Sequence, residues 1–349
     1  MPGNTFGTSL TITTFGESHG KALGVIIDGL ESNFQIDLDD LAFQMSRRRP
    51  GGNRLGTKRN EKDEIEILSG MFEGKTTGTP LAILIRNTNQ HSDDYSPIAD
   101  FYRPGHADYT WDKKFGIRDW RGGGRSSGRE TAARLAAGAI AMQILRKKGI
   151  TITAYTTQIG PIKAKVKNLE DISKNLVSCC DNEQAEKMVQ LIDETREKKD
   201  SIGGIIECVI TNVPAGLGEP VFQKTEALLG QAILSLGAVK GIEFGEGFNC
   251  VNFTGSEHND PITKDGFETN RAGGINGGIT NGEPIIFRVP VKPTASISLP
   301  QRTIGIDGKE QTIVVEGRHD PCICVRIVPV IEAMSALTIL SLWYDQNGR

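Results

Sequence analysis

The stretch "RGGGRSSGRETAARLAAGAIAMQILRKKG", residues 121–149, predicts a glycine-rich loop that runs directly into a long helix. Ser127 and Glu130 have the spacing of an S-x-x-E capping box at the helix start, and Gly149 suits the position after its end. The helix is small and apolar on nearly all sides, which is typical of a helix buried on several faces. We therefore expect it to lie inside the protein, with other layers packed around it.

Similar runs of strands and helices flank this helix. Before it, strands are predicted at 8–14, 23–28, "EIEIL" and "PLAILIRN", and "IDLDDLAFQMSRRR" predicts a helix with Asp37 as N-cap. After it, strands are predicted at "GGIIECVITNVPAG", "AVKGIEFGEGF" and "PIIFRVPVKPT", and helices at "KTEALLGQAILSLG" and "VPVIEAMSALTILSLWYD". The polar segment 165–200 predicts a peripheral helical insertion. We expect two similar mixed layers in one unit, residues 1–349, rather than separate domains.

Composition excludes several classes of protein. The 349 residues carry a net charge of −3, which argues against a nucleic-acid binder. No apolar run is long enough for a transmembrane helix, and the N-terminus lacks the blocks of a signal peptide. The six cysteines show no C-x-x-C spacing, so we expect no metal site. A cytoplasmic, soluble protein with reduced thiols, without membrane or nucleic-acid partners, is predicted.

Two arginine-bearing loops point to anionic ligands. In the 121–129 loop, Arg125 and Arg129 precede a helix whose free N–H groups attract anions, although a well-capped helix with solvated arginines is the plainer alternative. "SRRRPGGNR", residues 46–54, adds Arg48 and Arg54 in a dense cluster. Cations near a helix C-terminus are favourable without any function, so this second loop leaves both interpretations open.

Three further stretches carry polar groups that suit catalysis or phosphate binding. "GESHG" (16–20) presents His19 between glycines, and "YRPGHADYT" (102–110) places Arg103 and His106 around a Pro-Gly turn. "KPTASIS" (292–298) and "EGRHDPC" (316–322) could hold anions, or be an ordinary strand exit and a salt-bridged turn. No Walker A, G-x-S-x-G or G-x-G-x-x-G pattern occurs where it would indicate a nucleotide site or a serine hydrolase. The set favours a small substrate or cofactor with several negative charges.

Together these stretches resemble the chorismate synthase family. "GESHG", "RGGGRSSGRETAARLAAGAIA" and "GRHDPC" look like its three signatures, and "RRRPG", "YRPGHADYT", "VPAGLGEPVF", "AVKGIEFGEGF", "AGGINGGITNG" and "KPTASI" follow in the family's order. The resemblance extends from about residue 3 to 340. It implies a monofunctional enzyme of the bacterial type, a carbon–oxygen lyase that converts 5-enolpyruvylshikimate 3-phosphate to chorismate in the last step of the shikimate pathway.

The implied reaction is a 1,4-anti elimination of phosphate that requires reduced FMN without net redox change. The resemblance assigns three catalytic residues. His19 would protonate the reduced flavin, His106 the departing phosphate, and Asp320 would assist the flavin in removing the ring proton. General acid–base steps of this kind are worth about 10²–10⁴-fold each.

The resemblance also implies the residues that bind the ligands. For the substrate anions they are Arg48, Arg103 and Arg129, with Arg54 nearby; Arg48 and Arg54 are sometimes assigned to NADP instead. Arg318 is expected at one of the two ligands, among the substrate anions or with the cofactor. For FMN they are Arg125, Ser126, Ser127, Gly237, Ala238, Gly277, Lys292, Pro293, Thr294, Ala295 and Ser296. Gly237 stands where many members have Asn, so a side-chain contact is expected to be lost there.

The family fold is α+β, a β-α-β sandwich with an inner helical layer between two antiparallel sheets and internal pseudo-symmetry. A homotetramer is implied. Because no extra domain is evident, an external flavin reductase or another source of reduced FMN is expected.

Two other functions stay open at this point. A flavin-dependent reductase would transfer electrons from a nicotinamide, and a binding protein for FMN or a phosphometabolite would need the anion loops alone. Only the enzyme of the family would need His19, His106 and Asp320 together.

Overall fold

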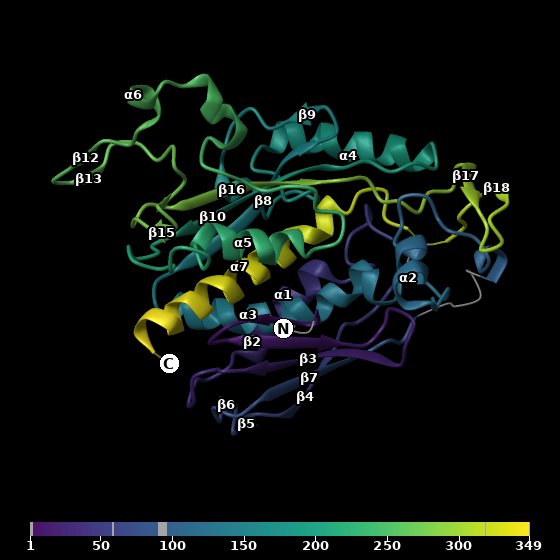
Figure 1. The fold of residues 1–349 in the computed structure, drawn as a ribbon, viewed down its shortest axis with the longest axis horizontal. Coiled ribbons are helices and arrows are strands. Elements are labelled where there is room, and N and C mark those ends of the chain that lie inside the picture. Colours follow the sequence, from purple (N-terminus) through teal and green to yellow (C-terminus); the bar gives the residue numbers. More distant parts are fainter. Residues whose placement is uncertain (1–2, 58, 90–95, 318, 349) are drawn as a thin grey trace.

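The computed structural model describes residues 3–348 of the chain except 58, 90–95 and 318. In this part of the chain the strands form two five-stranded sheets and four two-stranded ones, each paired antiparallel. Helices lie between the two large sheets (Figure 1). Each large sheet is followed in the chain by one long inner helix, which repeats the same plan in both halves. The predicted fold class is therefore confirmed.

The first sheet is built from the N-terminal part of the chain. Its order is β1 (Thr5–Gly7), β2 (Thr11–Phe15), β3 (Ala22–Asp28), β7 (Leu81–Arg86) and β4 (Ile65–Ser69). Along β7, Leu81, Ile83 and Ile85 are fully buried while the residues between them are not. Because buried residues recur at every second position, one apolar face of the sheet is directed toward the helices. The hairpin β5 (Met71–Phe72) and β6 (Lys75–Thr76) extends from it.

The second sheet comes from the other half of the chain. Its order is β11 (Glu243–Phe244), β16 (Ile285–Val291), β10 (Gly204–Thr211), β8 (Thr151–Ile159) and β9 (Ile162–Lys163). Phe287 and Val289 of β16 and Ile206 of β10 point inward and are buried. The strand predicted at 238–248 is reduced to the two residues of β11, because Gly245 and Gly247, which follow it with positive φ, turn the chain.

Four helices fill the space between the sheets. They are α1 (Leu38–Arg48), α3 (Thr131–Lys147), α5 (Thr225–Leu234) and α7 (Cys324–Asn347). As predicted, Asp37 caps α1 by accepting hydrogen bonds from the backbone N–H groups of Asp39 and Asp40, both at 3.0 Å. Gly149, after the end of α3, has a φ of +83° and is suited to that turn.

The start of α3 differs from the prediction. A short 3₁₀ turn, Gly128–Glu130, precedes the helix, and the Ser127 hydroxyl accepts from the N–H of Arg129 at 3.2 Å. The Glu130 carboxylate does not complete the capping box, because it accepts from Arg134 Nε at 3.0 Å instead. The predicted capping box was therefore wrong, although Ser127 does cap the turn. Similarly, α7 begins at Cys324, earlier than the predicted Val328, and carries Pro329 within its first turns.

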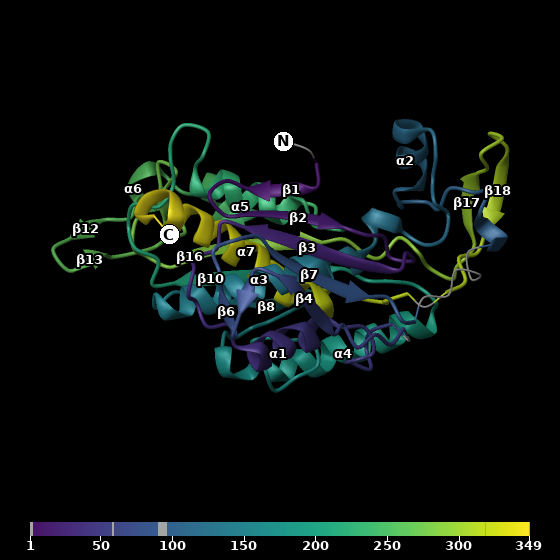
Figure 2. The ribbon, with the colours of Figure 1, turned by 90° about the horizontal axis from the view of Figure 1, so that it is seen from below.

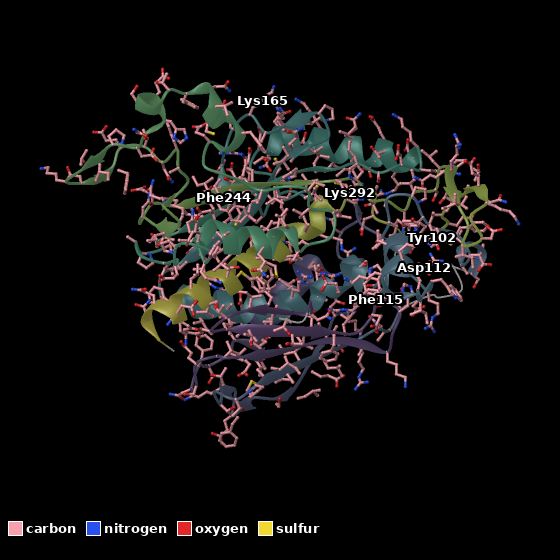
Figure 3. All side chains as sticks on the ribbon, in the orientation of Figure 1. Tyr102, Asp112, Phe115, Lys165, Phe244 and Lys292 are labelled. Carbon is pink, nitrogen blue, oxygen red and sulfur yellow. The ribbon has the colours of Figure 1, made fainter. Side chains whose placement is uncertain are left out.

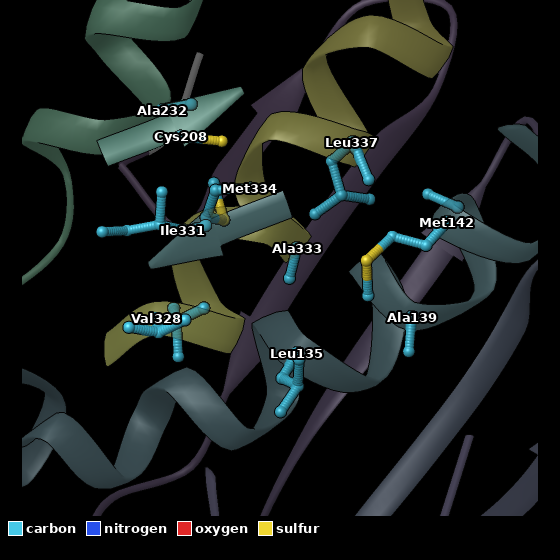
Figure 4. Close-up of a cluster of buried hydrophobic side chains, with 14 of the residues drawn as sticks. Leu135, Ala139, Met142, Cys208, Ala232, Val328, Ile331, Ala333, Met334 and Leu337 are labelled. Carbon is cyan, nitrogen blue, oxygen red and sulfur yellow. The ribbon is translucent and has the colours of Figure 1, made fainter. Parts of the chain in front are cut away.

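The central core lies where α3 and α7 cross. Leu135 and Met142 of α3 cluster with Ala333 and Leu337 of α7 and with Cys208 of β10 (Figure 4). The expectation that α3 is buried on several sides is confirmed, since most of its residues are buried. A close approach of the two helices requires a glycine: a Cβ at Gly138 would lie 2.4 Å from the Cβ of Ala333 and 2.5 Å from its Cα.

Gly138→Ala should consequently destabilise the protein. Helix propensity favours alanine by about 1 kcal/mol, but overpacking a tight core usually costs about 1–3 kcal/mol and here the atoms that must move are backbone atoms. The matched control is Gly230→Ala in α5, where the added Cβ would meet no heavy atom within 4 Å beyond the adjacent backbone of its own helix. Urea unfolding should show a loss of stability for the first and no loss for the second; equal stabilities would contradict the packing described here.

Smaller elements surround this sandwich. The helix α4 (Asn182–Glu197) packs beside β9 at the sheet edge, as expected of the charged insertion. At one end, α2 (Asp108–Phe115) stands next to the hairpin of β17 (Gln301–Ile304) and β18 (Glu310–Ile313), and at the other end the hairpin of β12 (Ile262–Thr263) and β13 (Gly266–Phe267) extends outward (Figure 2). The remaining short elements are α6 (Gly255–His258), β14 (Ile275–Asn276) and β15 (Ile279–Thr280).

Helix α7 is long and apolar enough to cross a membrane by length and composition alone. Its most apolar 18-residue window is, however, 94% buried inside the protein. Its hydrophobicity is accounted for by its place in the core.

Candidate active site

A cavity of about 580 Å³ lies between the two halves, at the ends where α3 and α7 begin. Lys292, labelled in Figure 3, directly follows β16 of the second sheet and lines this cavity. Helix N-termini carry free N–H groups and a positive dipole end, so two of them favour an anion in this cavity.

The lining of the cavity is strongly cationic. Among the residues that the structure describes, it contains seven arginines and Lys292 but only two carboxylates, Glu130 and Asp320. The arginines are Arg48, Arg59, Arg103, Arg125, Arg129, Arg134 and Arg326. Such a surplus in a protein of net charge −3 indicates a ligand with several negative charges.

Two of these arginines share one buried carboxylate. Asp63, whose side chain is 0% exposed, binds Arg48 Nη1 through one oxygen at 2.9 Å and Arg129 Nη1 through the other. Arg48 also donates from Nε to Thr131 and from Nη2 to the carbonyl of Gly128. Burial, together with the nearby charges of Arg326 and Arg129, lowers the pKa of Arg48 to about 9 although Asp63 opposes this shift. Arg48 therefore serves as a fixed part of the wall.

Arg129 keeps one donor for a ligand. Its Nε donates to Asn87 at 2.9 Å and its Nη1 to Asp63, but its buried Nη2 has no hydrogen-bond partner. The hydroxyl of Thr294, in another wall of the same cavity, is also buried without a partner. Buried polar groups are nearly always satisfied, so these two atoms indicate where a polar ligand would complete the site.

The loop before α2 brings Arg103 and His106 to the cavity, as predicted. Asp108, 3% exposed, accepts from Arg103 Nε at 2.7 Å and from His106 Nδ1 at 2.9 Å. Burial of His106 lowers its pKa below 6.5, and the charges of Arg103 and Arg118 add to this, while Asp108 opposes it. The imidazole is therefore mainly neutral at neutral pH in the free cavity.

His19 lines the cavity from the turn between β2 and β3. The hydroxyl of Ser18 lies 3.0 Å from His19 Nδ1, and the N–H of Ser18 donates to the carbonyl of Gly124 at 3.4 Å. The ring packs against Gly122, where an added Cβ would lie 2.2 Å from Nδ1 and where φ is +93°. The glycine-rich loop is thus shaped to admit this histidine.

Asp320 lies at the opposite wall, just before α7. Its carboxylate accepts from the N–H of Thr57 at 2.8 Å and from Arg326 Nη1 at 2.6 Å. Arg326 in turn donates from Nε to the carbonyl of Arg48 at 3.0 Å. The three predicted catalytic side chains therefore all face one cavity.

Most of the predicted ligand-binding residues also line it. Arg125 reaches the cavity, but its guanidinium turns back onto the first sheet, where it donates to the Thr14 hydroxyl at 2.6 Å and to the carbonyl of Gly16 at 3.1 Å. Lys292 lies 3.4 Å from the carbonyl of Gly105, so the second half of the chain contacts the loop that carries His106. The other residues brought together are Ser126, Ser127, Gly237, Ala238, Pro293, Thr294, Ala295 and Ser296.

Two predicted residues lie outside the cavity lining, and a third is not among the described residues. Arg54 forms an ion pair with Asp193 of α4 at 2.8 Å and its side chain is 57% exposed. Gly277 lies in the turn between β14 and β15 and is not part of the lining. Arg318 lies outside the described residues. The roles suggested for these three stay predictions.

Sequence reasoning missed the carboxylates that hold the arginines. Glu61 and Asp63 are 1% and 4% exposed, yet they stand in the charged run "NEKDE", which is typical of a solvated loop. The alternation of buried and exposed residues from 61 to 64, just before a strand, is the signal that could have found them. Arg59, Arg134 and Arg326 were missed as well, because nothing marks their side chains as turned toward a cavity.

Glu61 gives the protein a predictable acid sensitivity. Burial raises the pKa of its carboxyl, but hydrogen bonds from Arg59 and from Thr88 outweigh this and lower the pKa from 4.5 to about 2. A lowered pKa in the folded state stabilises the fold above the unfolded pKa, and this stabilisation is lost as the pH falls toward 2.

The difference in free energy of unfolding between wild type and Glu61→Gln, on the order of 3 kcal/mol near neutral pH, should shrink as the pH falls from about 5 to about 2. Denaturant unfolding at several pH values measures it. Glu170→Gln, whose side chain is 84% exposed, serves as the control and should show little difference at any pH. A difference that stays constant with pH would contradict the assignment.

Comparison with known proteins identifies the family of the chain. Residues 10–344 match the family model for chorismate synthase. A chorismate synthase from Cytophaga hutchinsonii is 53% identical over 97% of this chain and 97% of that protein. One from Synechocystis sp. is 52% identical over 97% of this chain and 96% of that protein. A crystal structure of a chorismate synthase has a TM-score of 0.76 with this fold at 30% sequence identity, covering 98% of this chain and 93% of the other. The chain belongs to the chorismate synthase family.

Proposed function

We propose that the cavity at the start of α3 and α7 is where this chorismate synthase binds 5-enolpyruvylshikimate 3-phosphate beside reduced FMN. The enzyme is a carbon–oxygen lyase of the last step of the shikimate pathway. The single observation that carries the placement is the buried, partnerless Nη2 of Arg129 in a lining of seven arginines and one lysine among the described residues. A phosphate and two carboxylates on the substrate, with a second phosphate on FMN, match this surplus.

The residues present suit a flavin phosphate and a flat ring. Gly123, Ser126 and Ser127 form a backbone-rich turn that leads into α3, and Ser126 to Gly128 border the cavity. On the facing wall, the hydroxyl of Thr294 lacks a partner within a segment, 292–296, that lines the cavity along its whole length. Gly237 and Ala238 add a third wall. The volume of about 580 Å³ lies within the range of small-molecule sites.

Reduced flavin, when bound, would supply electron density while the allylic C–O bond to phosphate breaks. The chain's own residues bind and move protons around it. His106 would donate a proton from its ring to the departing phosphate, with Arg103 beside it to neutralise charge. His19 would hold a proton near the flavin. Asp320, held by Thr57 and Arg326, would stand as the carboxylate that assists removal of the ring proton.

Several features of the enzyme belong to the same proposal. A single domain is supported by one hydrophobic core that includes residues of both large sheets. We further propose a cytoplasmic homotetramer that depends on an external flavin reductase, or another source of reduced FMN. Exposed apolar side chains such as Phe222 and Phe248, 88% and 84% exposed, are the kind of surface that subunit contacts would cover.

The test is turnover of 5-enolpyruvylshikimate 3-phosphate without oxygen, with photoreduced FMN. Phosphate release in step with chorismate absorbance, and with the flavin still reduced at the end, supports the proposal. Net oxidation of the flavin would instead favour a reductase. FMN binding without any phosphate release would favour a binding protein.

A further inference from the structure

Asp108 makes an unusually complete set of contacts with cationic groups. One carboxylate oxygen accepts from Arg103 Nη2 at 2.8 Å and lies 2.9 Å from His106 Nδ1. The other accepts from the N–H and Nε of Arg103 at 3.1 and 2.7 Å, and lies 3.2 Å from Arg118 Nη1. The carboxylate is almost fully buried, with a side-chain exposure of 3%. It is the first residue of α2, where a helix N-terminus also favours negative charge.

These contacts fix the protonation state of Asp108. Burial raises its pKa, but the hydrogen bonds from Arg103 and His106 outweigh burial and hold the pKa well below its usual range. An ionised carboxylate only accepts hydrogen bonds. The proton between Asp108 and His106 must therefore sit on Nδ1 of the histidine.

We infer that Asp108 is a positioning residue that holds His106 in the tautomer protonated at Nδ1, which leaves Nε2 as the one ring atom that exchanges a proton with a ligand in the cavity. The same carboxylate orients Arg103, so the proton donor and an anion-binding side chain are set by one group. The expected effect of Asp108 on kcat rests on the proposed function of His106, whereas the tautomer of His106 does not.

The surroundings of the pair leave few competing partners. Among the described residues, the charged groups that act most strongly on His106 are Arg103 and Asp108 of its own loop and α2, and Arg118 after α2. Lys292 comes from the facing segment, with its Nζ at 3.4 Å from the carbonyl of Gly105. Among these, Asp108 is the one acceptor, so it alone in this set can select the tautomer.

The tautomer can be read directly by ¹⁵N solid-state NMR of protein labelled only at the imidazole nitrogens of histidine. The chain has five histidines, so His106→Gln identifies the signal of His106 by difference. In wild type at about pH 8, well above the usual histidine pKa, we expect a protonated Nδ1 and an unprotonated Nε2. Protonated Nε2 in the neutral ring of wild type would overturn the inference, whether or not the protein turns over substrate.

Asp108→Asn then tests the cause, because an amide side chain can donate as well as accept. We expect His106 to move toward protonation at Nε2. The matched control is Asp112→Asn on the same helix, since Asp112 accepts from the Tyr102 hydroxyl at 2.6 Å, whereas the carboxylate at 2.9 Å from His106 Nδ1 belongs to Asp108. The control should keep the wild-type signal. An unchanged signal in Asp108→Asn would contradict the inference.

Activity supplies the second readout. Asp108→Asn should lower kcat by about 10²–10⁴-fold, the range of one misplaced acid–base group, while Asp112→Asn stays within a few-fold of wild type. If Asp108→Asn fails to fold, Asp108→Glu keeps the negative charge and should retain the Nδ1 tautomer. Loss of that tautomer in folded Asp108→Glu would also count against the assignment. Normal kcat with a changed tautomer would remove the kinetic consequence and leave the positioning intact.

Discussion

His106→Ala should release phosphate from 5-enolpyruvylshikimate 3-phosphate about 10²–10⁴-fold more slowly than wild type, under anaerobic conditions with photoreduced FMN. The physical reason is that the departing phosphate then leaves without a proton donor at hydrogen-bond distance. His106 is the group best placed for this step, because it lines the cavity beside Arg103 and is held by Asp108. Phosphate release and chorismate absorbance should slow together.

The pH dependence of kcat/KM distinguishes a His106 that acts as the acid from a His106 that only lies beside the ligand. Burial and the charges of Arg103 and Arg118 lower the pKa of His106 below 6.5, so its protonated form is lost at a lower pH than in an ordinary histidine. If protonated His106 is the required acid, kcat/KM of wild type should fall as the pH rises and this form is lost. His106→Gln should show no such fall. His258→Ala is the control, since His258 lies in α6 against Phe253 and outside the cavity lining. Full turnover in His106→Ala would remove this residue from the mechanism and leave the family assignment standing.

Asp63→Asn should lower the free energy of unfolding by about 3–5 kcal/mol, because it removes the carboxylate between two buried arginines. The side chains of Arg48 and Arg129 are 1% and 2% exposed, so water cannot replace the lost partner. Denaturant unfolding measures the effect. Glu64→Gln is the matched control from the same run of charges, with a side chain 77% exposed, and it should change stability little.

A double variant separates lost charge compensation from lost packing. Adding Arg48→Met to Asp63→Asn removes one of the two buried charges, so the double variant should recover part of the stability lost by Asp63→Asn alone. If the double variant loses more free energy of unfolding than the two single variants lose together, the site needs the guanidinium of Arg48 for its shape. Equal stability of wild type and Asp63→Asn would contradict the bridging role altogether.

The sequence predicted the layers well because their signals are local. The apolar, alanine-rich run of α3 and the alternation in β7 each bury one face, and that alone requires a partner layer. The spacing of Asp37 before α1 likewise predicted a cap that the structure has. The start of α3 was missed because Arg134 competes for Glu130, and that competition depends on a side chain one turn further along the helix.

The site was predicted in part, for a similar reason. His19, His106 and Asp320 lie in short motifs, and the cavity lining brings them together. Arg125 was predicted to face a ligand, yet its guanidinium donates to β2, a contact that no local pattern reveals. The partners of Asp63 and Glu61 come together only when α1, β4 and the start of α3 pack against one another. In the sequence, the charged run that contains these two carboxylates therefore looks like solvent-exposed surface.

The crossing of α3 with α7 has a consequence for biosynthesis. When the ribosome has completed α3, its packing partner, the 24-residue α7, has not yet been made. The nascent chain must therefore hold an apolar helix and the open face of the first sheet unburied until α7 has been synthesised. Packing of the inner layer should therefore wait until α7 has left the ribosome. A premature stop before Cys324 would leave a chain whose inner layer lacks α7, the packing partner of α3.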